Sequence, residues 1–208
     1  MPSPTYRNAI LLACLAGTSV GYGQRLSYGL KAGGAISDAG LISADESKRY
    51  IVGGTVEVNL GRGFAAEADV LYRRNGFTSQ FTYGPGFFPS DSAVTITNRS
   101  RSSVLEIPVL GKYYFRHERQ AQPFVLTGYS FRKAHTTNDT RFAGAGAPNR
   151  QKSSYWTPLN IGATIGTGMS WRMGGIALGP EIRYTHWGSQ QTNGLSKHQT
   201  DSLLGIRF

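Results

Sequence analysis

The sequence predicts an all-β protein in which eight antiparallel strands close into an up-and-down barrel that spans a membrane. Three observations lead to this prediction. Segments of strand length alternate between apolar and polar residues with a period of two. The connections between these segments are alternately short and long. Nearly all the charge of the segments lies on one parity, so each strand has one charged face and one apolar face.

Eight segments carry the alternation, and each has about the 9–11 residues that a tilted strand needs to cross a bilayer. The predicted strands span residues 26–36, 50–60, 64–73, 104–115, 123–132, 159–172, 176–187 and 201–208. The alternation is least clear in 123–132. The last strand, "DSLLGIRF", ends on the aromatic Phe208, which we expect at a membrane rim where aromatic girdles form.

The connections predict which end of the barrel faces outward. Short turns follow the second, fourth and sixth strands, at 61–63, 116–122 and 173–175. Long loops follow the other strands, at about 37–49, 74–103, 133–158 and 188–197. Short periplasmic turns and long extracellular loops are typical of outer-membrane barrels. An even number of strands places both chain ends on the short-turn side.

The charged parity predicts a polar lumen that is plugged by ion pairs. It carries six acidic and six basic residues: Glu57, Glu67, Asp69, Glu106, Glu181 and Asp201, with Lys31, Arg73, Lys112, Arg172, Arg183 and Arg207. Buried charges are tolerated when they are paired, and side chains can fill an eight-stranded barrel. The alternative is that these charges line a pore for small solutes. A soluble barrel with an apolar interior is the alternative fold.

The N-terminus predicts a secretory signal peptide over residues 1–23, which leaves a barrel domain over 24–208. Arg7 precedes the apolar stretch 9–20, which is too short to span a bilayer. A buried helix of a soluble domain and a lipoprotein signal at Cys14 are the alternatives. Cys14 is the only cysteine, so the mature chain is expected to lack disulfides. No later stretch is long and apolar enough for a transmembrane helix.

The residues that could carry chemistry do not form a recognisable site. No two of His117, His135, His186 and His198 have the spacing of a local metal motif, so we expect no metal and no cofactor. His186 has outward parity and Ser189 follows it, which leaves a lipid-modifying enzyme as an alternative. The competing interpretation places His186 and Trp187 in the interfacial belt. We therefore expect no catalytic residues.

The long loops are basic, with eleven basic against five acidic residues in a chain of net charge +10. Nucleic acid is not expected as the partner of an exported barrel. Lipopolysaccharide phosphates are the expected anions, and generic rim charge for solubility is the alternative. The expected contacts are Arg74, Arg99, Arg101, Arg132 and Lys133. The aromatic-rich stretch 75–92 is expected to form a hairpin above the membrane, or else to present exposed aromatics to a partner.

Several strands resemble those of the small outer-membrane β-barrel proteins of Gram-negative bacteria that are often called porin-family. The matching stretches are "LEIPVLGKYYF" (105–115), "EADVLYRRNG" (67–76), "IGTGMSW" (165–171) and "EIRYTHW" (181–187). The resemblance implies an outer-membrane barrel without shared catalytic residues. Leu204, Ile206 and Phe208 resemble the signal that the barrel-assembly machinery reads. We therefore expect a monomeric, non-enzymatic barrel with a structural or surface-binding role.

Overall fold

The computed structural model describes residues 26–38, 50–84, 93–115, 120–144, 150–188 and 197–208. The predicted signal peptide at 1–23, most of the connection 37–49 and Ser189 therefore lie outside the described residues. Within the described ranges, no helix is long and apolar enough to cross a bilayer.

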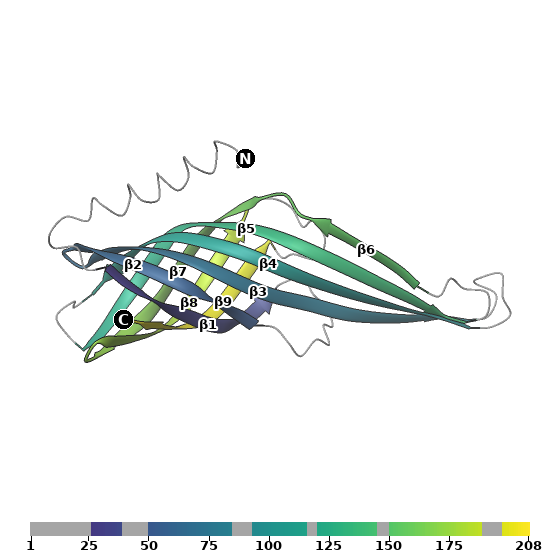
Figure 1. The fold of residues 1–208 in the computed structure, drawn as a ribbon, viewed down its shortest axis with the longest axis horizontal. Coiled ribbons are helices and arrows are strands. Elements are labelled where there is room, and N and C mark those ends of the chain that lie inside the picture. The colour runs from purple at the N-terminus through teal and green to yellow at the C-terminus, as the bar shows by residue number, and fades with distance from the viewer. Residues whose placement is uncertain (1–25, 39–49, 85–92, 116–119, 145–149, 189–196) are drawn as a thin grey trace, which may run out of the picture.

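Eight strands form a closed antiparallel ring, which confirms the predicted fold (Figure 1). The described strands are β1 (Leu26–Asp38), β2 (Tyr50–Gly61), β3 (Phe64–Tyr83), β4 (Val94–Tyr114), β5 (Ala121–Ala143), β6 (Arg150–Trp156), β7 (Asn160–Met173), β8 (Ile176–Trp187) and β9 (His198–Arg207). Around the ring the order is β4, β3, β2, β1, β9, β8, β7 and β5, and β5 pairs with β4 to close it. The short β6 lies outside the ring and pairs with β5 alone.

The two faces of each strand differ as the alternation predicts. In β4, Glu106 and Lys112 are buried, whereas Leu105 and Val109 on the other parity are exposed. The same holds in β3, where Asp69 is buried and its neighbour Val70 is 55% exposed. The barrel therefore has a polar interior and an apolar exterior, which is the arrangement that a protein surrounded by lipid requires.

The side-chain positions in β5 explain why the alternation of this strand is unclear in the sequence. Phe124 and Leu126 point inward and are buried, whereas Val125 and Tyr129 point outward and are exposed. Both faces of this strand are thus apolar at the same level. The inward rings need space, and Gly168 on β7 supplies it, because a Cβ there would lie 2.5 Å from the Phe124 ring.

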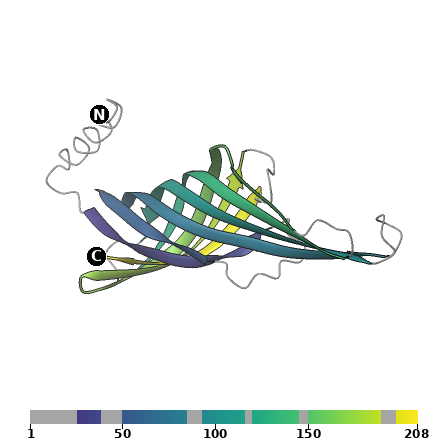
Figure 2. The same cartoon turned by 45° about the vertical axis from the view of Figure 1, so that its right-hand side comes forward.

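Three strands continue well past the barrel as a common wall, so the predicted boundaries of the loops at 74–103 and 133–158 are wrong. Asn75–Tyr83 of β3 pairs with Val94–Ser102 of β4, which confirms the predicted hairpin for its described residues. The distal half of β5 pairs with the same part of β4, and β6 adds a fourth strand. Figures 1 and 2 show this wall projecting to the right from one side of the barrel. The sequence predicted only the membrane-spanning lengths.

The two short turns that the structure describes in full, at 61–63 and 173–175, lie at the opposite end, together with the C-terminus (Figure 1). The turn between β2 and β3 needs left-handed backbone at Gly61 and Gly63, whose φ values are 87° and 84°. Exposed aromatic residues lie near this end, namely Tyr28, Phe64, Phe115, Trp171 and Phe208. The backbone N–H of Phe208 donates to the carbonyl of Tyr28 over 2.9 Å, so the last residue extends the β1–β9 pairing. These residues form the lower aromatic girdle.

The lipid-facing assignment can be tested at Val70. We expect Val70→Lys to destabilise the barrel by about 2–4 kcal/mol in lipid vesicles, because it places a charge on the lipid face near the bilayer centre. Reversible denaturant unfolding in bilayers measures this change. Gln80→Lys is the matched control, because Gln80 lies on the same strand in the wall above the membrane. Equal effects of the two substitutions would contradict the assignment.

Candidate functional site: a sealed lumen and a basic outer wall

The centre of the lumen is an ion-pair cluster around two carboxylates of β3. Glu67 contacts Lys31 of β1 at 2.7 Å, Lys112 of β4 at 2.5 Å and Arg183 of β8 at 2.8 Å. Asp69 contacts Lys31 at 3.2 Å and Arg183 at 2.7 Å. Glu67 is 2% exposed and Asp69 0%, so these charges are shielded from water. The cluster joins four strands that surround the lumen.

Glu181 of β8 is the third carboxylate of this cluster. Oxygens of Glu67, Asp69 and Glu181 all lie within 4.8 Å of one another, a separation at which three carboxylates could hold a metal ion. Two cations already occupy this space. Lys31 contacts Glu181 at 2.9 Å and Arg183 contacts it at 2.6 Å, in addition to their contacts with the other two acids. Lys112, which contacts Glu67 and lies 3.6 Å from Glu181, is the third cation, so the three carboxylates are balanced by side chains of the chain itself.

Towards the short-turn end, a second group of polar residues surrounds Glu57. The Tyr114 hydroxyl lies 2.9 Å from both carboxylate oxygens of Glu57. Arg207 forms an ion pair with Glu57 and donates to the Tyr114 oxygen over 2.9 Å. Its other terminal nitrogen donates to the Ser170 hydroxyl over 3.1 Å. Lys112 links this group to the central cluster, because its Nζ also lies 3.4 Å from Glu57.

Towards the extracellular end, a third group surrounds Arg73. Its guanidinium donates to Asp201 over 2.9 and 2.5 Å and lies 3.4 Å from Glu106. The Gln199 amide nitrogen donates to Glu106 and Asp201 over 3.2 and 2.7 Å. The amide thus bridges two acids, and its oxygen remains available to donors above it.

Trp187 and Arg132 are those donors, and both lie where the sequence analysis did not place them. The Trp187 indole N–H donates to the Gln199 oxygen over 3.1 Å, and the Arg132 guanidinium stacks 3.9 Å from the indole ring. Trp187 is 0% exposed, so its predicted place in the interfacial belt is wrong. Arg132 is buried as well, so it is not an outer-rim contact. Gly162 makes room for the indole, because a Cβ there would lie 2.7 Å from the ring.

Arg172 is the one predicted lumen charge that the structure places elsewhere. Its side chain is exposed near the short-turn end of β7, where the strand runs past the barrel interior. The other eleven predicted residues are buried. Because Arg132 is buried and Arg172 is not, the described lumen still contains six acidic and six basic side chains. Charge balance is thus maintained by a different arginine from the one expected.

The outward face of the extended wall has a basic groove of about 490 Å³. Strands β3 to β6 line it with Tyr72, Arg74, Arg99, Arg101, Ser102, Ser103, His135, Thr137, Asp139, Arg141, Arg150 and Lys152. Three of the predicted rim contacts, Arg74, Arg99 and Arg101, therefore lie together. Arg141, Arg150 and Lys152 add three cations from β5 and β6. From the sequence they were expected only as part of the basic charge of the long loops, and not as members of one site. We call this surface the basic groove.

Asp139 is the one acidic residue among the described residues that line the basic groove. Arg150 donates to its two carboxylate oxygens over 2.7 and 2.6 Å, a bidentate pair between neighbouring strands. These hydrogen bonds hold the pKa of Asp139 below its usual value and raise the pKa of Arg150. Both groups are therefore charged at neutral pH, and six basic side chains face one acid.

The basic groove begins just above the lipid-facing surface of the same strands. On β4, Arg99 and Arg101 share their parity with Leu105, which is 47% exposed, and with Val109. Arg101 is four residues from Leu105, or about 13 Å along the strand. Lys133 lies on the neighbouring β5 with its Nζ 5.5 Å from the ring of the exposed Trp156. The groove thus continues the apolar outward face of the same strands.

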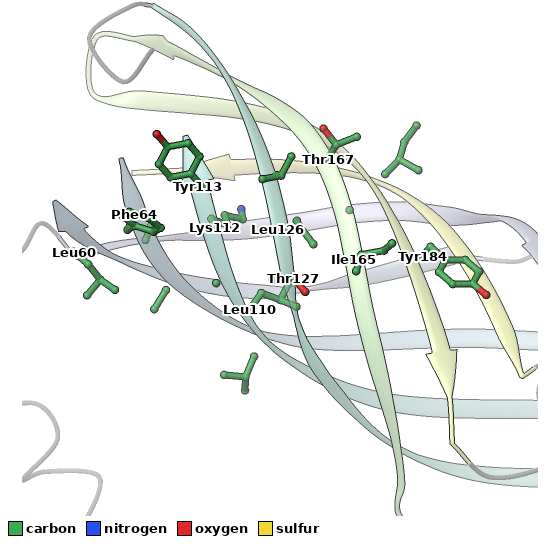
Figure 3. A pocket seen from close by; sticks show the side chains of 17 residues that line it. Leu60, Phe64, Leu110, Lys112, Tyr113, Leu126, Thr127, Ile165, Thr167 and Tyr184 are labelled. Carbon is green, nitrogen blue, oxygen red and sulfur yellow. The ribbon is translucent and has the colours of Figure 1, made fainter. Parts of the chain in front are cut away.

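A second hollow, of about 940 Å³, lies lower on the outer wall and is apolar. Ala66, Gly111 and Thr127 are neighbours across β3, β4 and β5, so small side chains form its floor. Larger outward side chains surround them, among them Phe64, Tyr113, Ile165 and Tyr184 (Figure 3). The hollow is therefore a depression in the apolar outer surface, with no cluster of polar groups to orient a ligand.

The remaining candidate residues are also outside the lumen. Leu204, Ile206 and Phe208 point outward on the last strand and are exposed. His186 contacts His198 on the neighbouring strand, an approach that the sequence analysis did not predict. His135 lies against Trp156, with ring centroids 4.8 Å apart. His117 and Ser189 lie outside the described residues, so the structure does not test the proposed His186–Ser189 pair.

A closed barrel with paired charges sealed inside and an apolar surface outside is an integral membrane β-barrel. The chain belongs to the outer membrane protein beta-barrel domain family, whose model matches residues 18–188. The protein is therefore located in the outer membrane of a Gram-negative bacterium. This confirms the family resemblance drawn from the strand motifs.

The chain is similar to solved structures at low sequence identity. Neisserial surface protein A is 16% identical with a TM-score of 0.52, and the match covers 89% of this chain and 98% of that protein. The attachment invasion locus protein Ail of Yersinia pestis is 15% identical with a TM-score of 0.42, covering 89% and 97%. The barrel domain of Pseudomonas aeruginosa OprF is 13% identical with a TM-score of 0.35, covering 88% and 97%. None of the curated protein sequences matches the chain.

The central cluster predicts a large cost for neutralising Glu67. We expect Glu67→Gln to destabilise the folded barrel by about 3–5 kcal/mol, because it leaves three buried cations without their shared partner. Denaturant titration followed by the mobility of folded and unfolded forms on unheated gels measures the change. Asp139→Asn is the matched control, since it breaks an exposed ion pair and should leave the midpoint almost unchanged. A wild-type midpoint for Glu67→Gln would contradict this role.

Proposed function

We propose that this outer-membrane barrel is a non-enzymatic surface-binding protein that holds anionic groups in the basic groove. The convergence of six basic side chains from β3, β4, β5 and β6 on one groove carries the proposal. Cations that lie together on a rigid sheet can donate several charge-assisted hydrogen bonds to one anion. Generic rim charge would need no such clustering.

We further propose that the anions are phosphates of lipopolysaccharide in the surrounding leaflet. From the groove, the same faces of β3 and β4 continue downward into the lipid-facing Tyr72 and Leu105. A lipid packed against these residues would bring its headgroup to the level of Arg101 and Arg74. Planar guanidinium groups suit this role, because they can bind phosphate through two parallel hydrogen bonds.

The sealed lumen supports a binding role rather than a pore. Twelve charged side chains fill the interior in three groups, two of which Lys112 links, and Trp187 and Arg132 lie at their extracellular end. A conducting path would have to break ion pairs that are buried on every side. The small-solute pore is therefore not favoured. The barrel acts as a monomeric scaffold for its wall.

The groove can be tested by removing charge without changing the fold. We expect Arg99→Gln with Arg101→Gln to weaken binding of purified protein to lipopolysaccharide by about tenfold or more, because hydrogen bonds to charged groups contribute about 1.5–3 kcal/mol each. Binding of the reconstituted protein to lipid A, with and without its phosphates, measures this loss. The difference between variant and wild type should vanish for dephosphorylated lipid A.

Arg62→Gln with Arg172→Gln is the matched control, because it removes the same charge from exposed positions at the opposite end of the barrel. This control should bind like the wild type. Equal losses in both double variants would mean that total charge, and not the groove, determines binding. An unchanged mass of lipid A from expressing cells is expected of a non-enzymatic barrel, and a mass shift would contradict it.

We also propose that the last strand serves as the signal for the barrel-assembly machinery. Phe208 is supported in this role by its outward side chain and by its pairing with Tyr28, whose ring centroid lies 6.3 Å away. We expect Phe208→Ala to lower the amount of folded protein in the outer membrane severalfold. The purified variant should still fold in detergent, because the substitution removes only one of many outward side chains. Fractionation with heat-modifiable gel mobility measures both amounts, and Leu26→Ala is the control for loss of an exposed apolar side chain.

A further inference from the structure

Two histidines that are distant in sequence face each other on the outer surface of the barrel. His186 near the end of β8 and His198 at the start of β9 are direct register partners. Their Nδ1 atoms lie 3.3 Å apart, and their ring centroids are separated by 4.8 Å. The Tyr184 hydroxyl lies 2.6 Å from the same Nδ1 of His198. Two further heteroatoms that can bind a metal thus lie within 3.3 Å of the His198 Nδ1.

The cluster lies on the outward face near the extracellular end. His186 shares its parity with the exposed Ile182 and Tyr184, and His198 is itself exposed. On the other side of His186, its register partner on β7 is Ala163, whose side chain is a single methyl group. Among the described residues, the β7 neighbour of His186 therefore leaves space beside the histidines. The cluster lies on β8 and β9, away from the strands that line the basic groove.

The separation of the two nitrogens suits one small metal ion. Two ligand nitrogens at about 2.0–2.1 Å from a tetrahedral ion lie about 3.3–3.4 Å apart. Neutral imidazole is a preferred ligand of zinc, copper and nickel ions. Without a metal, the two facing Nδ1 atoms need a proton between them to form a hydrogen bond. A metal ion can take the place of that proton when both rings carry their hydrogen on Nε2.

We propose that His186 and His198 form a two-histidine site for a transition-metal ion of the zinc, copper and nickel class. The two Nδ1 atoms are the ligands, and the pairing of β8 and β9 holds them in position. The Tyr184 oxygen lies close enough to bind the ion or to accept a hydrogen bond from water in a remaining position. The bound ion links the two strands at the extracellular end of the barrel.

Zinc titration of the full-length folded protein, prepared without a histidine tag and followed by calorimetry in detergent, tests the site. We expect one ion per chain. Each of His186→Gln and His198→Gln should weaken binding at least tenfold, because loss of either ligand abolishes chelation. His135→Gln is the matched control, since His135 is also on the outer surface but lies against Trp156 rather than against a histidine. Heat-modifiable mobility verifies that every variant is folded.

Copper(II) supplies an independent readout of the ligands. Its electron paramagnetic resonance spectrum should show two coordinated nitrogens in the wild-type protein and in His135→Gln, and one or none in the single variants. Wild-type affinity in the variant lacking both His186 and His198 would overturn the proposal, because the ion would then bind elsewhere, for example at the lumen acids Glu67, Asp69 and Glu181. A one-nitrogen spectrum of the wild-type protein would overturn it as well.

Discussion

The rest of the structure depends on the three-way ion pairing of Glu67 inside a narrow barrel. A carboxylate buried without a partner would be prohibitively costly, and three cations from β1, β4 and β8 converge on it. Those strands lie at different points around the ring, so satisfying Glu67 requires the ring to close. Membrane lipid also requires closure, since it cannot hydrogen-bond an open sheet edge. Ion pairing in the lumen and the absence of hydrogen-bonding partners in lipid are therefore separate physical reasons for the same closed ring.

The lumen also shows how polar and aromatic groups share a confined space. Residues with both donor and acceptor atoms bridge charged side chains within two of the groups: Tyr114 lies between Glu57 and Arg207, and Gln199 connects two acids to Trp187. Glycines on β7 then provide the volume for the large rings, Gly168 for Phe124 and Gly162 for Trp187. Because the buried charges of the interior are paired with one another, we expect binding to other molecules to involve the outer wall.

The alternation of the strands correctly predicted which side chains point into the lumen. The predictions were wrong for residues at the ends of strands. Eleven of twelve lumen charges follow from parity alone, as does the outward position of Phe208. Arg172 has the right parity, but it lies at a strand end beyond the interior. Trp187 and Arg132 are amphipathic residues near the rim of the barrel. Such side chains can point either into the lumen or outward there, so residue type did not predict their direction. The pairing of His186 with His198 depends on the register of β8 and β9, which no local motif reveals.

Strand length was the other feature that hydropathy could not supply, and it has the greatest consequence for function. Along the outward parity of β4, the side chains change from Val109, Ile107 and Leu105 through Ser103 to Arg101 and Arg99. The backbone pairing continues unchanged across this transition, so only the chemistry of the side chains marks where lipid ends. A search of the sequence for apolar alternation therefore ends the strand at that point, although the paired strands continue beyond it. The same alternation that buries Glu106 therefore holds the arginines on the outward face, at a height fixed by the apolar residues below them.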